Sequence, residues 1–577
     1  MQKLIIYMKP FWVGVLFIII FMFGQAFAEL TLPKVMADMI NNGMMLGDSG
    51  YVLQKGGVML LVALLSSGCS IVGSFLSAQA ALGLGRDLRD KVFTKVLSYS
   101  LDEFSKIGTA SLITRTTNDI TQIQTTVVMA FRFIIYSPIM CIGGIIMAHS
   151  VDTGLSKILL VIIPLMMGFI AVVAKFVIPL FTQMQKNVDK LNLVLRENLT
   201  GIRVIRAFNR QNYERERFGT ANKNLTDVAI RVNRIMAFMQ PVIMLFMNAT
   251  TLLIIWFGGV RIAQSNLQIG DMMAFLQYAM QIMMSLIMVT VMFVMLPRAQ
   301  ASAVRVNEVI EMESSIEDNG VTIARTPQPG KIEFKDVSYR YHDAEEPVLR
   351  GITFTAEPGE ITAIIGGTGS GKSTVVNLIP RFYDVESGQI LVDGVDVREQ
   401  PIEDLRGKLG FVSQSAILFS GTVAENIRYG NESATEEEMI NAAEVAQAHD
   451  FISQLDKGYD SGVAQGGTNL SGGQRQRLSI ARALIRRPEI YVFDDSFSAL
   501  DFKTDAKLRA ALKQEVGSAT QIIIAQRIST IMDANKIIVI NEGEVVGIGT
   551  HKELLKTCEV YGEIARSQLS EEELAHE

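Results

Sequence analysis

Two shortages in this 577-residue sequence exclude whole classes of protein before any motif is considered. It has only three cysteines, Cys69, Cys141 and Cys558, and the first two lie in apolar runs, so a disulfide-stabilised scaffold is excluded. Basic residues are scarce in the second half: residues 327–577 hold 25 Lys and Arg against 39 Asp and Glu, a net charge of −14. A nucleic-acid-binding surface needs clustered basic residues, so no nucleic-acid partner is expected. The length exceeds that of one ordinary domain and predicts at least two.

The first half has little charge of either sign and contains long apolar runs instead. Residues 1–326 carry 28 Lys and Arg against 20 Asp and Glu, a net charge of +8. A bilayer core about 30 Å thick needs roughly 20 mostly apolar residues of helix. Six charge-free runs approach or exceed this length: Phe11–Ala28, Gly56–Gly85, Phe133–Val151, Ile158–Ala174, Ile235–Val260 and Met272–Pro297. The first run could be a signal peptide, but it is longer than a signal core and five more follow, which favours an uncleaved first helix.

The segments between these runs differ in basic charge, and this difference predicts their orientation. Segments 86–132 and 175–234 hold 7 and 12 Lys and Arg, whereas 29–55, 152–157 and 261–271 hold 2, 1 and 1. Basic segments stay on the cytoplasmic side, so both chain termini are predicted to be cytoplasmic. No Arg- and Ser-rich organelle presequence is present, and a bacterial cell inner membrane is therefore expected.

The two basic segments are also long, and they contain few Gly or Pro residues that would break a helix. If each forms an antiparallel helical pair, it extends roughly 35–45 Å beyond the bilayer. A solvated loop is the alternative, but loops of this length without secondary structure are uncommon. Rigid helical stalks are therefore the prediction.

Methionines are frequent in the last three apolar runs, Met239, Met247 and Met283 among them. Ordinary helix packing explains any single one of them. Met is flexible and polarizable, however, and surfaces that accept varied apolar shapes use it heavily. With Gln240 and Gln281 nearby, the group also suits a permissive cavity for apolar small molecules, and both interpretations stay open.

The second half changes to short β-branched runs separated by turns and helices, which is an α/β pattern. Residues 361–365 are predicted as a buried strand, and a Gly-rich loop ending in Lys-Ser follows directly, before an apolar helix. In this context the pattern G-x-x-x-x-G-K-S predicts a loop whose backbone N–H groups, lysine and serine hold the phosphates and Mg²⁺ of a bound ATP. The residues concerned are Gly366, Gly367, Thr368, Gly369, Ser370, Gly371, Lys372, Ser373 and Thr374. Asp494, which ends the apolar strand 490–494, is predicted to hold the Mg²⁺ through its water shell.

Further motifs resemble the ATP-binding cassette (ABC) family, and the resemblance covers the whole chain. Between the two phosphate-site elements lies a segment similar to the family signature, made of Leu470, Ser471, Gly472, Gly473 and Gln474. Gln414 is similar to the Q-loop glutamine, Asp501 to the D-loop aspartate, and Tyr341 to the aromatic residue that stacks on adenine. In the first half, residues 197–208 look like the segment that leads to a coupling helix.

The resemblance implies a fold, a partner and a mechanism. The fold class is an α-helical six-span transmembrane domain at residues 1–326, fused to an α/β P-loop nucleotide-binding domain with a helical subdomain at residues 327–577. Two such chains would sandwich two ATP molecules, each held between the Walker elements of one chain and the signature of the other. Mg²⁺ would be held by Ser373, Gln414 and Asp494. Closure around ATP would turn the membrane half outward, and hydrolysis would reopen it.

Two positions depart from the family pattern. Asp495 stands where efficient members have Glu, and displacing a catalytic carboxylate by about 1 Å can cost on the order of 100-fold in rate. Gln526 stands where the switch histidine is expected, and it cannot carry a positive charge. One interpretation is that Asp495 is a slow base and Gln526 a harmless variant. Two changes in one site favour the other, a degenerate site.

An intact signature beside this degenerate catalytic group, Asp495, Gln526 and Gln414, predicts one half of a heterodimer. The partner would be a second half-transporter with a competent catalytic Glu and a switch His. The expected activity is ATP-driven export of varied apolar or amphipathic compounds through the lipid bilayer, as in multidrug transporters. A lipid or lipopeptide flippase is a close alternative, because it shares every motif. An ATP-gated channel or regulator is a third hypothesis, which no sequence feature favours.

Overall fold

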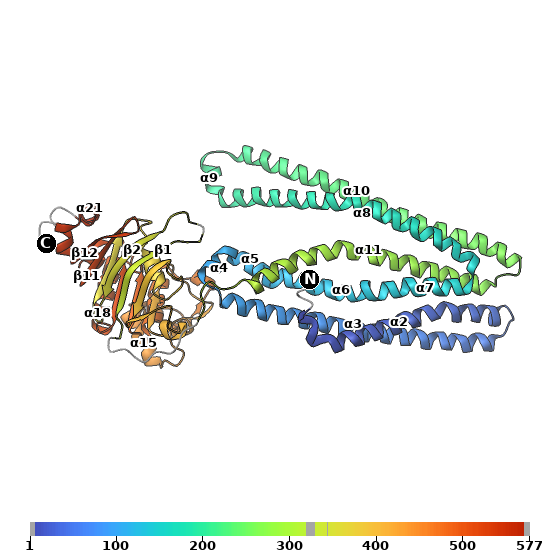
Figure 1. Cartoon of the computed structure of the whole chain (residues 1–577), viewed down its shortest axis with the longest axis horizontal. Helices are drawn as coiled ribbons and strands as arrows, with labels where there is room; N and C mark the ends of the chain where they lie inside the picture. The colour runs from blue at the N-terminus through green and yellow to red at the C-terminus, as the bar shows by residue number, and fades with distance from the viewer. Residues whose placement is uncertain (1–5, 319–328, 343, 570–577) are drawn as a thin grey trace. The chain divides into compact units, whose positions relative to one another are not determined.

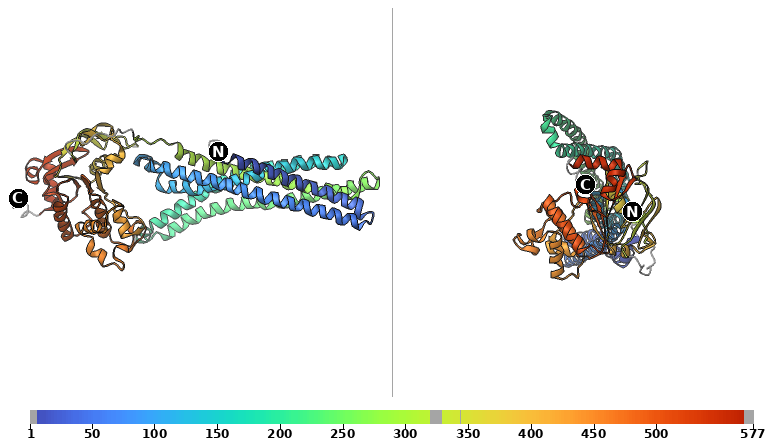
Figure 2. Two further views of the ribbon diagram at one scale, coloured as in Figure 1. Left: turned by 90° about the horizontal axis from the view of Figure 1, so that it is seen from below. Right: turned by 90° about the vertical axis from the view of Figure 1, so that its left-hand side faces the viewer.

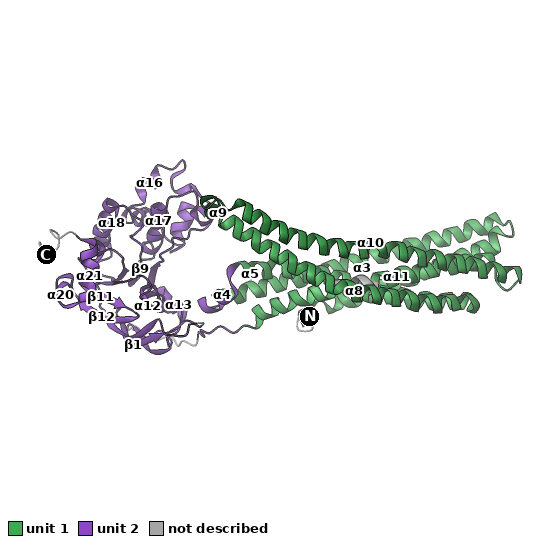
Figure 3. Cartoon of the chain, turned by 90° about the horizontal axis from the view of Figure 1, so that it is seen from above, with its two compact units in different colours: residues 1–97, 110–312 green, residues 98–109, 313–577 purple. Residues whose placement is uncertain are grey.

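The computed structural model describes residues 6–318, 329–342 and 344–569, with the backbone alone for 289–294. The chain divides into two compact units, and Figure 3 colours them separately. Unit 1 contains residues 1–97 and 110–312, and unit 2 contains residues 98–109 and 313–577. The predicted boundary after residue 326 lies outside the described residues. A short segment of the N-terminal half, 98–109, thus belongs to the second unit.

Unit 1 is entirely helical in its described part. Its elements are η1 (Ile6–Phe11), α2 (Trp12–Met39), η2 (Ile40–Met44), α3 (Ser49–Leu97), α5 (Thr109–Thr114), η3 (Arg115–Asp119), α6 (Ile120–Ala130), η4 (Phe131–Tyr136), α7 (Ser137–Val151), α8 (Thr153–Thr200), α9 (Ile202–Ala207), α10 (Gln211–Ala263) and α11 (Ile269–Glu311). Six stretches of this unit are long and apolar enough to cross a membrane, which confirms the predicted six spans. The two basic segments are helical as well, since α3, α8 and α10 each continue far beyond their apolar runs.

The span helices bury one narrow face and leave the rest apolar and exposed. In α2 the buried residues recur every three or four positions, at Ile18, Met22, Ala26, Leu30 and Pro33. Helices α8 and α10 lie side by side along their lengths (Figures 1 and 2). Their outer faces carry large apolar side chains such as Leu160 and Trp256, which are 76% and 69% exposed. An apolar surface of this kind suits lipid as its solvent.

Polar contacts fix the helix ends and the bundle interior at a few points. Asp152 caps α8, because its Oδ1 accepts a hydrogen bond from the Leu155 N–H at 2.7 Å. Its Oδ2 lies 2.8 Å from Arg261 Nη2, which ties the start of α8 to the end of α10. The third span contains two π-helical segments, η3 and η4, that end on Asp119 and Tyr136. Segments of this type are frequent where a helix must aim a functional side chain.

Unit 2 is built on a six-stranded sheet and a four-stranded sheet, with a short third pair. The strands are β1 (Ile332–Tyr339), β2 (Leu349–Ala356), β3 (Ile361–Gly366), β4 (Ser387–Val392), β5 (Val395–Asp396), β6 (Leu409–Val412), β7 (Gly421–Thr422), β8 (Gly462–Val463), β9 (Ile490–Asp494), β10 (Thr520–Ile524), β11 (Lys536–Asn541) and β12 (Glu544–Gly549). The larger sheet has the order β12-β11-β3-β10-β9-β6 and is parallel except for the edge strand β12. Its central strands are buried on both faces, as apolar runs in a parallel sheet must be.

Helices surround this sheet, and several of them form the predicted helical subdomain. They are α4 (Leu101–Ile107), α12 (Lys372–Leu378), α13 (Ile402–Gly407), α14 (Val423–Arg428), α15 (Glu436–Val445), α16 (His449–Ser453), η5 (Gly458–Asp460), η6 (Gln465–Gly467), α17 (Gly472–Leu484), α18 (Phe502–Glu515), α19 (Ile528–Ile531), α20 (His551–Thr557) and α21 (Glu559–Gln568). Helix α4 comes from the N-terminal half, and Glu103 near its start accepts a hydrogen bond from the Ser315 N–H at 3.0 Å. The predicted fold class, six spans fused to an α/β unit, is confirmed.

Candidate functional site

The Gly-rich loop lies where the sequence places it, between the buried strand β3 and helix α12. Gly371 caps α12 in the left-handed region at φ 98°, and Gly369 is also left-handed, so both positions favour glycine. Gly366 lacks room for a side chain, because a Cβ there would lie 2.0 Å from the Ile540 carbonyl oxygen. The tip of the loop, Gly367 to Gly369 with Thr368 between them, is exposed, whereas Ser370 is buried. The loop is therefore curled, with its tip accessible to a ligand.

Lys372 holds the curl of this loop. Its Nζ donates hydrogen bonds to the Gly366 and Gly367 carbonyl oxygens, at 2.9 and 2.6 Å. Burial lowers the pKa of the ammonium group, and the carboxylates of Asp495 and Asp494 raise it in part. A lysine in a loop of this type is well suited to bind phosphate oxygens together with the backbone N–H groups of the loop.

A pair of oxygen ligands lies next to the lysine. Ser373, at the start of α12, donates a hydrogen bond to Asp494 Oδ1 at 3.0 Å. Asp494 ends β9 and is buried, and this burial raises the pKa of its carboxyl group, while the Ser373 hydrogen bond lowers it. Hydroxyl and carboxylate oxygens are the ligands that Mg²⁺ prefers. The residues present therefore fit a magnesium ion held with the phosphates of a nucleotide.

Three tyrosine rings pack together next to helix α12. Tyr341 packs edge-on against Tyr339 and Tyr383, with ring centroids 5.0 and 5.5 Å apart. Its hydroxyl lies 3.1 Å from the Thr374 hydroxyl in α12. The contact links the predicted adenine-stacking residue to the phosphate-binding helix, so these two predicted parts of the nucleotide site are neighbours.

The two departing residues meet each other in the structure. Strands β6, β9 and β10 are adjacent and parallel, so Gln414, Asp495 and Gln526 emerge at the same edge of the sheet. Gln526 Nε2 donates to Asp495 Oδ2 at 2.8 Å, and Gln414 Nε2 donates to the same oxygen at 3.3 Å. Burial raises the pKa of the Asp495 carboxyl group, and the Gln414 hydrogen bond lowers it. Both glutamine amide groups thus converge on one carboxylate oxygen.

The backbone at Asp495 is unusual. Its φ of 47° lies in the left-handed region, which costs a non-glycine residue on the order of 1–3 kcal/mol. The Asp495 N–H donates to the Ile524 carbonyl oxygen at 3.1 Å, which continues the contact between β9 and β10 by one residue. The Ser498 hydroxyl donates to the Asp495 carbonyl oxygen at 2.9 Å. These contacts fix the carboxylate against Gln526.

The signature segment forms a well-capped helix start. Ser471 caps the 13-residue helix α17, and Gln474 completes the capping box by accepting from the Ser471 N–H at 2.8 Å. Leu470 is buried, whereas Ser471 and Gly472 are exposed and Gly473 is half-buried. Among the described residues, no hydrogen bond joins this segment to the Gly-rich loop. Asp501 is exposed too, and caps α18 by accepting from the Thr504 N–H at 3.0 Å.

Sequence reasoning missed one residue that holds this site. Gln568, at the end of α21, donates from Nε2 to the Gln526 carbonyl oxygen at 2.8 Å. Its Oε1 accepts from the Ile528 N–H at 2.9 Å. Helix α21 therefore contacts the segment that carries Gln526 through two hydrogen bonds, one to Gln526 and one to Ile528. No motif marks Gln568, and only its distance of 42 residues along the chain from Gln526 shows that the contact is tertiary.

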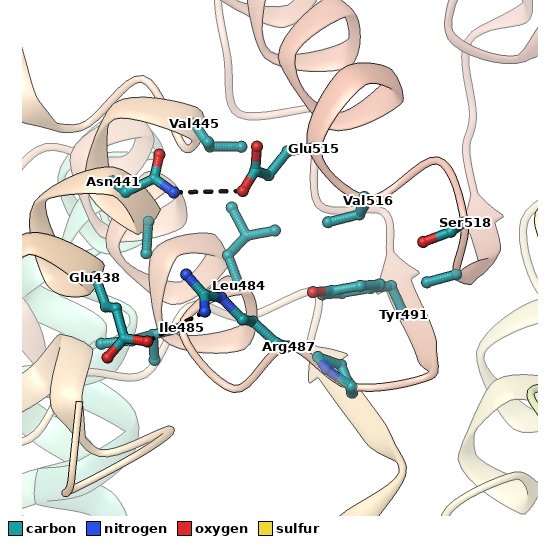
Figure 4. Close-up of a pocket in the computed structure, with 13 residues that line it drawn as sticks. Glu438, Asn441, Val445, Leu484, Ile485, Arg487, Tyr491, Glu515, Val516 and Ser518 are labelled. Carbon is teal, nitrogen blue, oxygen red and sulfur yellow. Dashed lines mark hydrogen bonds and ion pairs between the residues drawn. The ribbon is translucent and has the colours of Figure 1, made fainter. Parts of the chain in front are cut away.

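A second cavity, of about 190 Å³, lies at the opposite edge of the sheet, near the amino end of β9 (Figure 4). Four of the polar side chains that line it are paired with one another: Arg487 with Glu438 at 3.1 Å, and Asn441 with Glu515 at 3.3 Å. Ligands of parallel α/β sheets bind outside the carboxyl ends of the strands, where the Gly-rich loop lies. This cavity is therefore separate from the nucleotide site.

Comparisons with known proteins agree with this geometry. Residues 15–286 match the family model of the ABC transporter transmembrane region, and residues 349–498 match the ABC transporter family model. An uncharacterised ABC transporter ATP-binding protein of Mycobacterium tuberculosis is 45% identical over 552 residues, 94% of this chain and 93% of that protein. The uncharacterised protein YfiB of Bacillus subtilis is 40% identical over 572 residues, 99% of each chain.

Two further relatives add a name and a solved fold. An ATP-dependent lipid A-core flippase of Syntrophus aciditrophicus is 34% identical over 518 residues, 90% of this chain and 86% of the flippase. A bacterial Atm1-family ABC exporter, solved with ATP bound, superposes with a TM-score of 0.79 at 24% identity, over 98% of this chain and 99% of that one. At that identity the superposition shows the fold alone. On the family models and the full-length relatives, the chain belongs to the ABC transporters and is an exporter half-transporter, with its transmembrane and ATP-binding units fused in one polypeptide.

Proposed function

We propose that this chain is one half of a heterodimeric exporter that uses ATP to move apolar or amphipathic compounds out of a bacterial cell. In this proposal residues 1–326 form the transmembrane domain and residues 327–577 the nucleotide-binding domain. The chain lies in the inner membrane, with both termini and the nucleotide-binding domain in the cytoplasm. The apolar outer faces of the spans and the basic character of segments 86–132 and 175–234 support this placement.

The nucleotide site proposed here uses the residues that the structure brings together. The Gly-rich loop and Lys372 bind the phosphates of ATP, and Tyr341 stacks on the adenine. Ser373, Asp494 and Gln414 hold Mg²⁺, and the 3.0 Å contact between Ser373 and Asp494 supports the first two. When bound, Mg²⁺ neutralises charge on the β- and γ-phosphates. The residues of this chain orient the nucleotide and exclude water around it.

The contact between Gln526 and Asp495 is the observation that carries the proposal of a degenerate site. A catalytic carboxylate must accept a proton from the attacking water while it points at that water. Asp495 is one methylene shorter than Glu, and its Oδ2 already accepts from two amides. Gln526 supplies no positive charge for the γ-phosphate. The site therefore binds ATP and hydrolyses it slowly.

The signature segment has the opposite character, because it is intact and accessible. The exposed Ser471 stands at the start of α17, where helix N–H groups and the helix dipole favour an anion. In the proposed heterodimer this segment contacts the γ-phosphate of an ATP that the partner's Walker elements hold. The partner carries the competent Glu and the switch His, and this chain completes that site.

Two substitutions in the purified complex test the asymmetry. Asp495→Asn should leave most of the steady-state ATPase activity, because the partner's site carries the turnover. Ser471→Ala should lower the activity on the order of 100-fold, which is the cost of losing one donor to developing charge. The reverse pattern would refute the asymmetric model. A homodimer instead predicts full ATPase activity for this chain purified alone, so that measurement is the matched control.

A second candidate function is lipid or lipopeptide flipping, which the similarity to two ATP-dependent lipid A-core flippases favours. Vesicles with a fluorescent lipid in one leaflet, and separately with an apolar dye inside, distinguish the two functions. Lipid movement without dye efflux would replace export with flipping. A continuous conductance without stoichiometric ATP use would instead favour the ATP-gated channel.

A further inference from the structure

One carboxylate in unit 1 is held by three neutral donors from three different helices. Glu29 of α2 accepts from Gln25 Nε2 at 2.9 Å and from the Ser66 hydroxyl of α3 at 3.3 Å. Its other oxygen, Oε2, accepts a short hydrogen bond from the Tyr136 hydroxyl at the end of η4. Side chains 37 and 107 residues away in the sequence thus converge on one group.

The positions of Glu29 and Tyr136 along their span helices indicate how deep the cluster lies. At 1.5 Å per residue, Glu29 is about 22 Å below the end of η2 at Met44. Tyr136 lies the same number of residues before Val151, the end of α7, and therefore also about 22 Å deep. If the ends of η2 and α7 mark the same face of the bilayer, both helices place the cluster inside a hydrocarbon layer about 30 Å thick.

Glu29, which is half-buried, differs from two other carboxylates of this unit, Asp38 and Asp152, in the partners it has. Asp38 lies 2.6 Å from Lys55 Nζ, and Asp152 lies 2.8 Å from Arg261 Nη2. Among the described residues, no Lys or Arg lies within ion-pair distance of Glu29. All three of its partners donate hydrogen bonds, which suits the ionised carboxylate as acceptor. Arg132, four residues before Tyr136 in η4, acts electrostatically on the Tyr136 hydroxyl but forms no ion pair with Glu29, so among the described residues the carboxylate has no salt-bridge partner.

An isolated charge at this depth is costly, and such residues usually mark a ligand or ion path. The π-helical segment η4 is an independent sign, because π-segments cluster at functional sites and this one ends on Tyr136. Apolar side chains lie close by: Ala26, about one turn of α2 before Glu29, and Leu30, the next residue, pack in the same cluster as Met140 and Met283. A charged group beside adaptable apolar surface suits a ligand with both properties.

We propose that Glu29, with Tyr136, Gln25 and Ser66, is the recognition subsite for the positive charge of an organic cation with an apolar body. The carboxylate pairs with the cation, and the Tyr136 ring offers its face to it. The methionine-containing cluster packs against the apolar body. This inference rests on the proposed export function and adds the charge of the substrate to it.

Binding and ATPase measurements on the full complex test the subsite with tetraphenylphosphonium, and with triphenylphosphine oxide as a neutral compound of similar shape. Glu29→Gln keeps the size of the side chain and removes its charge. It should raise the half-maximal concentration for tetraphenylphosphonium at least tenfold, because a desolvated ion pair is lost. The value for the neutral compound should stay unchanged. Tyr136→Phe, which keeps the ring, should have a smaller effect on the cation.

Asp38→Asn is the matched control, because it removes a carboxylate from the same helix that already has a basic partner. It should leave the preference for the cation unchanged. Equal loss of both compounds in Glu29→Gln would show a structural role and overturn the subsite, as would an unchanged affinity for the cation. Cation binding that needs Glu29, without any transport, would support the subsite and refute export. Transport of the neutral compound without cation binding would do the reverse.

Discussion

If the proposed degenerate site is correct, restoring the catalytic pair should accelerate ATP hydrolysis at this chain's own site, provided that both residues change together. Asp495→Glu moves the carboxylate outward by about one C–C bond, or roughly 1.5 Å. Gln526 obstructs this movement, because its Nε2 already lies 2.8 Å from Asp495 Oδ2. Gln526→His removes that amide and supplies a ring that can be protonated. Neither substitution alone supplies both a correctly placed base and a charged switch residue.

The magnitude follows from the displacement. A misplacement of about 1 Å costs on the order of 100-fold in rate, which is about 2.7 kcal/mol at 1.36 kcal/mol per tenfold. We expect Asp495→Glu alone to gain about tenfold and Gln526→His alone to gain little. The double variant should gain about 100-fold or more. Residues in contact couple by about 0.5–3 kcal/mol, so the double change should exceed the product of the single changes by at least twofold.

The assay is single-turnover release of phosphate from labelled ATP, in a complex whose partner has lost its own catalytic carboxylate. Hydrolysis then comes from the site built on Asp495. Lys372→Ala in the same background removes the phosphate-binding lysine and sets the zero rate. A double variant no faster than the unmodified chain would refute the assignment of Asp495 and Gln526 as the cause of slow turnover. Strictly multiplicative single effects would refute their coupling.

Three further substitutions have expected outcomes that follow from contacts in the structure. Gln568→Ala removes both hydrogen bonds to the segment that carries Gln526 and should lower the free energy of unfolding by about 1–3 kcal/mol. Hydrogen exchange at residues 526–528 should become faster. Unchanged exchange would show that α21 does not stabilise this segment. Asp152→Ala removes a helix cap and leaves Arg261 unpaired, so the melting temperature in detergent should fall. Asp152→Asn keeps a hydrogen-bond acceptor and should lower the melting temperature by a smaller amount. Gly366→Ala would bring a Cβ to 2.0 Å from the Ile540 carbonyl oxygen and should abolish ATP binding, measured as the loss of the protection that ATP gives the full chain against proteolysis.

Local patterns predicted the elements that depend on neighbouring residues. The strand predicted at 490–494 coincides with β9, and the strand predicted at 361–365 is β3 with one residue more. Apolar runs located all six spans, because bilayer crossing requires a length that any sequence must show. The search for charge-free runs did not predict where these helices end. Helix α2 continues to Met39, although its charge-free run stops at Ala28. A charged residue ends an apolar run in the sequence, but it does not end a helix.

Contacts between distant segments were the part that the sequence could not provide. The identities of Asp495 and Gln526 marked them as departures from the family pattern. Their mutual hydrogen bond depends on the order β6-β9-β10, which no single motif contains. Gln568 carried no signal at all, because a glutamine near a chain end is ordinary until its partners are known.

Glu29 is a further residue whose contacts the sequence alone did not predict. It was excluded from the first predicted span because it is charged, and for the same physical reason its presence in the helix is informative. A carboxylate at that depth must be matched by donors or by a ligand charge, and α3 and η4 supply only neutral donors. The two halves of the chain thus use carboxylates in opposite ways. Asp495 accepts hydrogen bonds from two amides, which weakens it as a base in the proposed degenerate site. Glu29 accepts from three neutral donors and has no ion-pair partner among the described residues, so the proposed subsite selects a positively charged ligand.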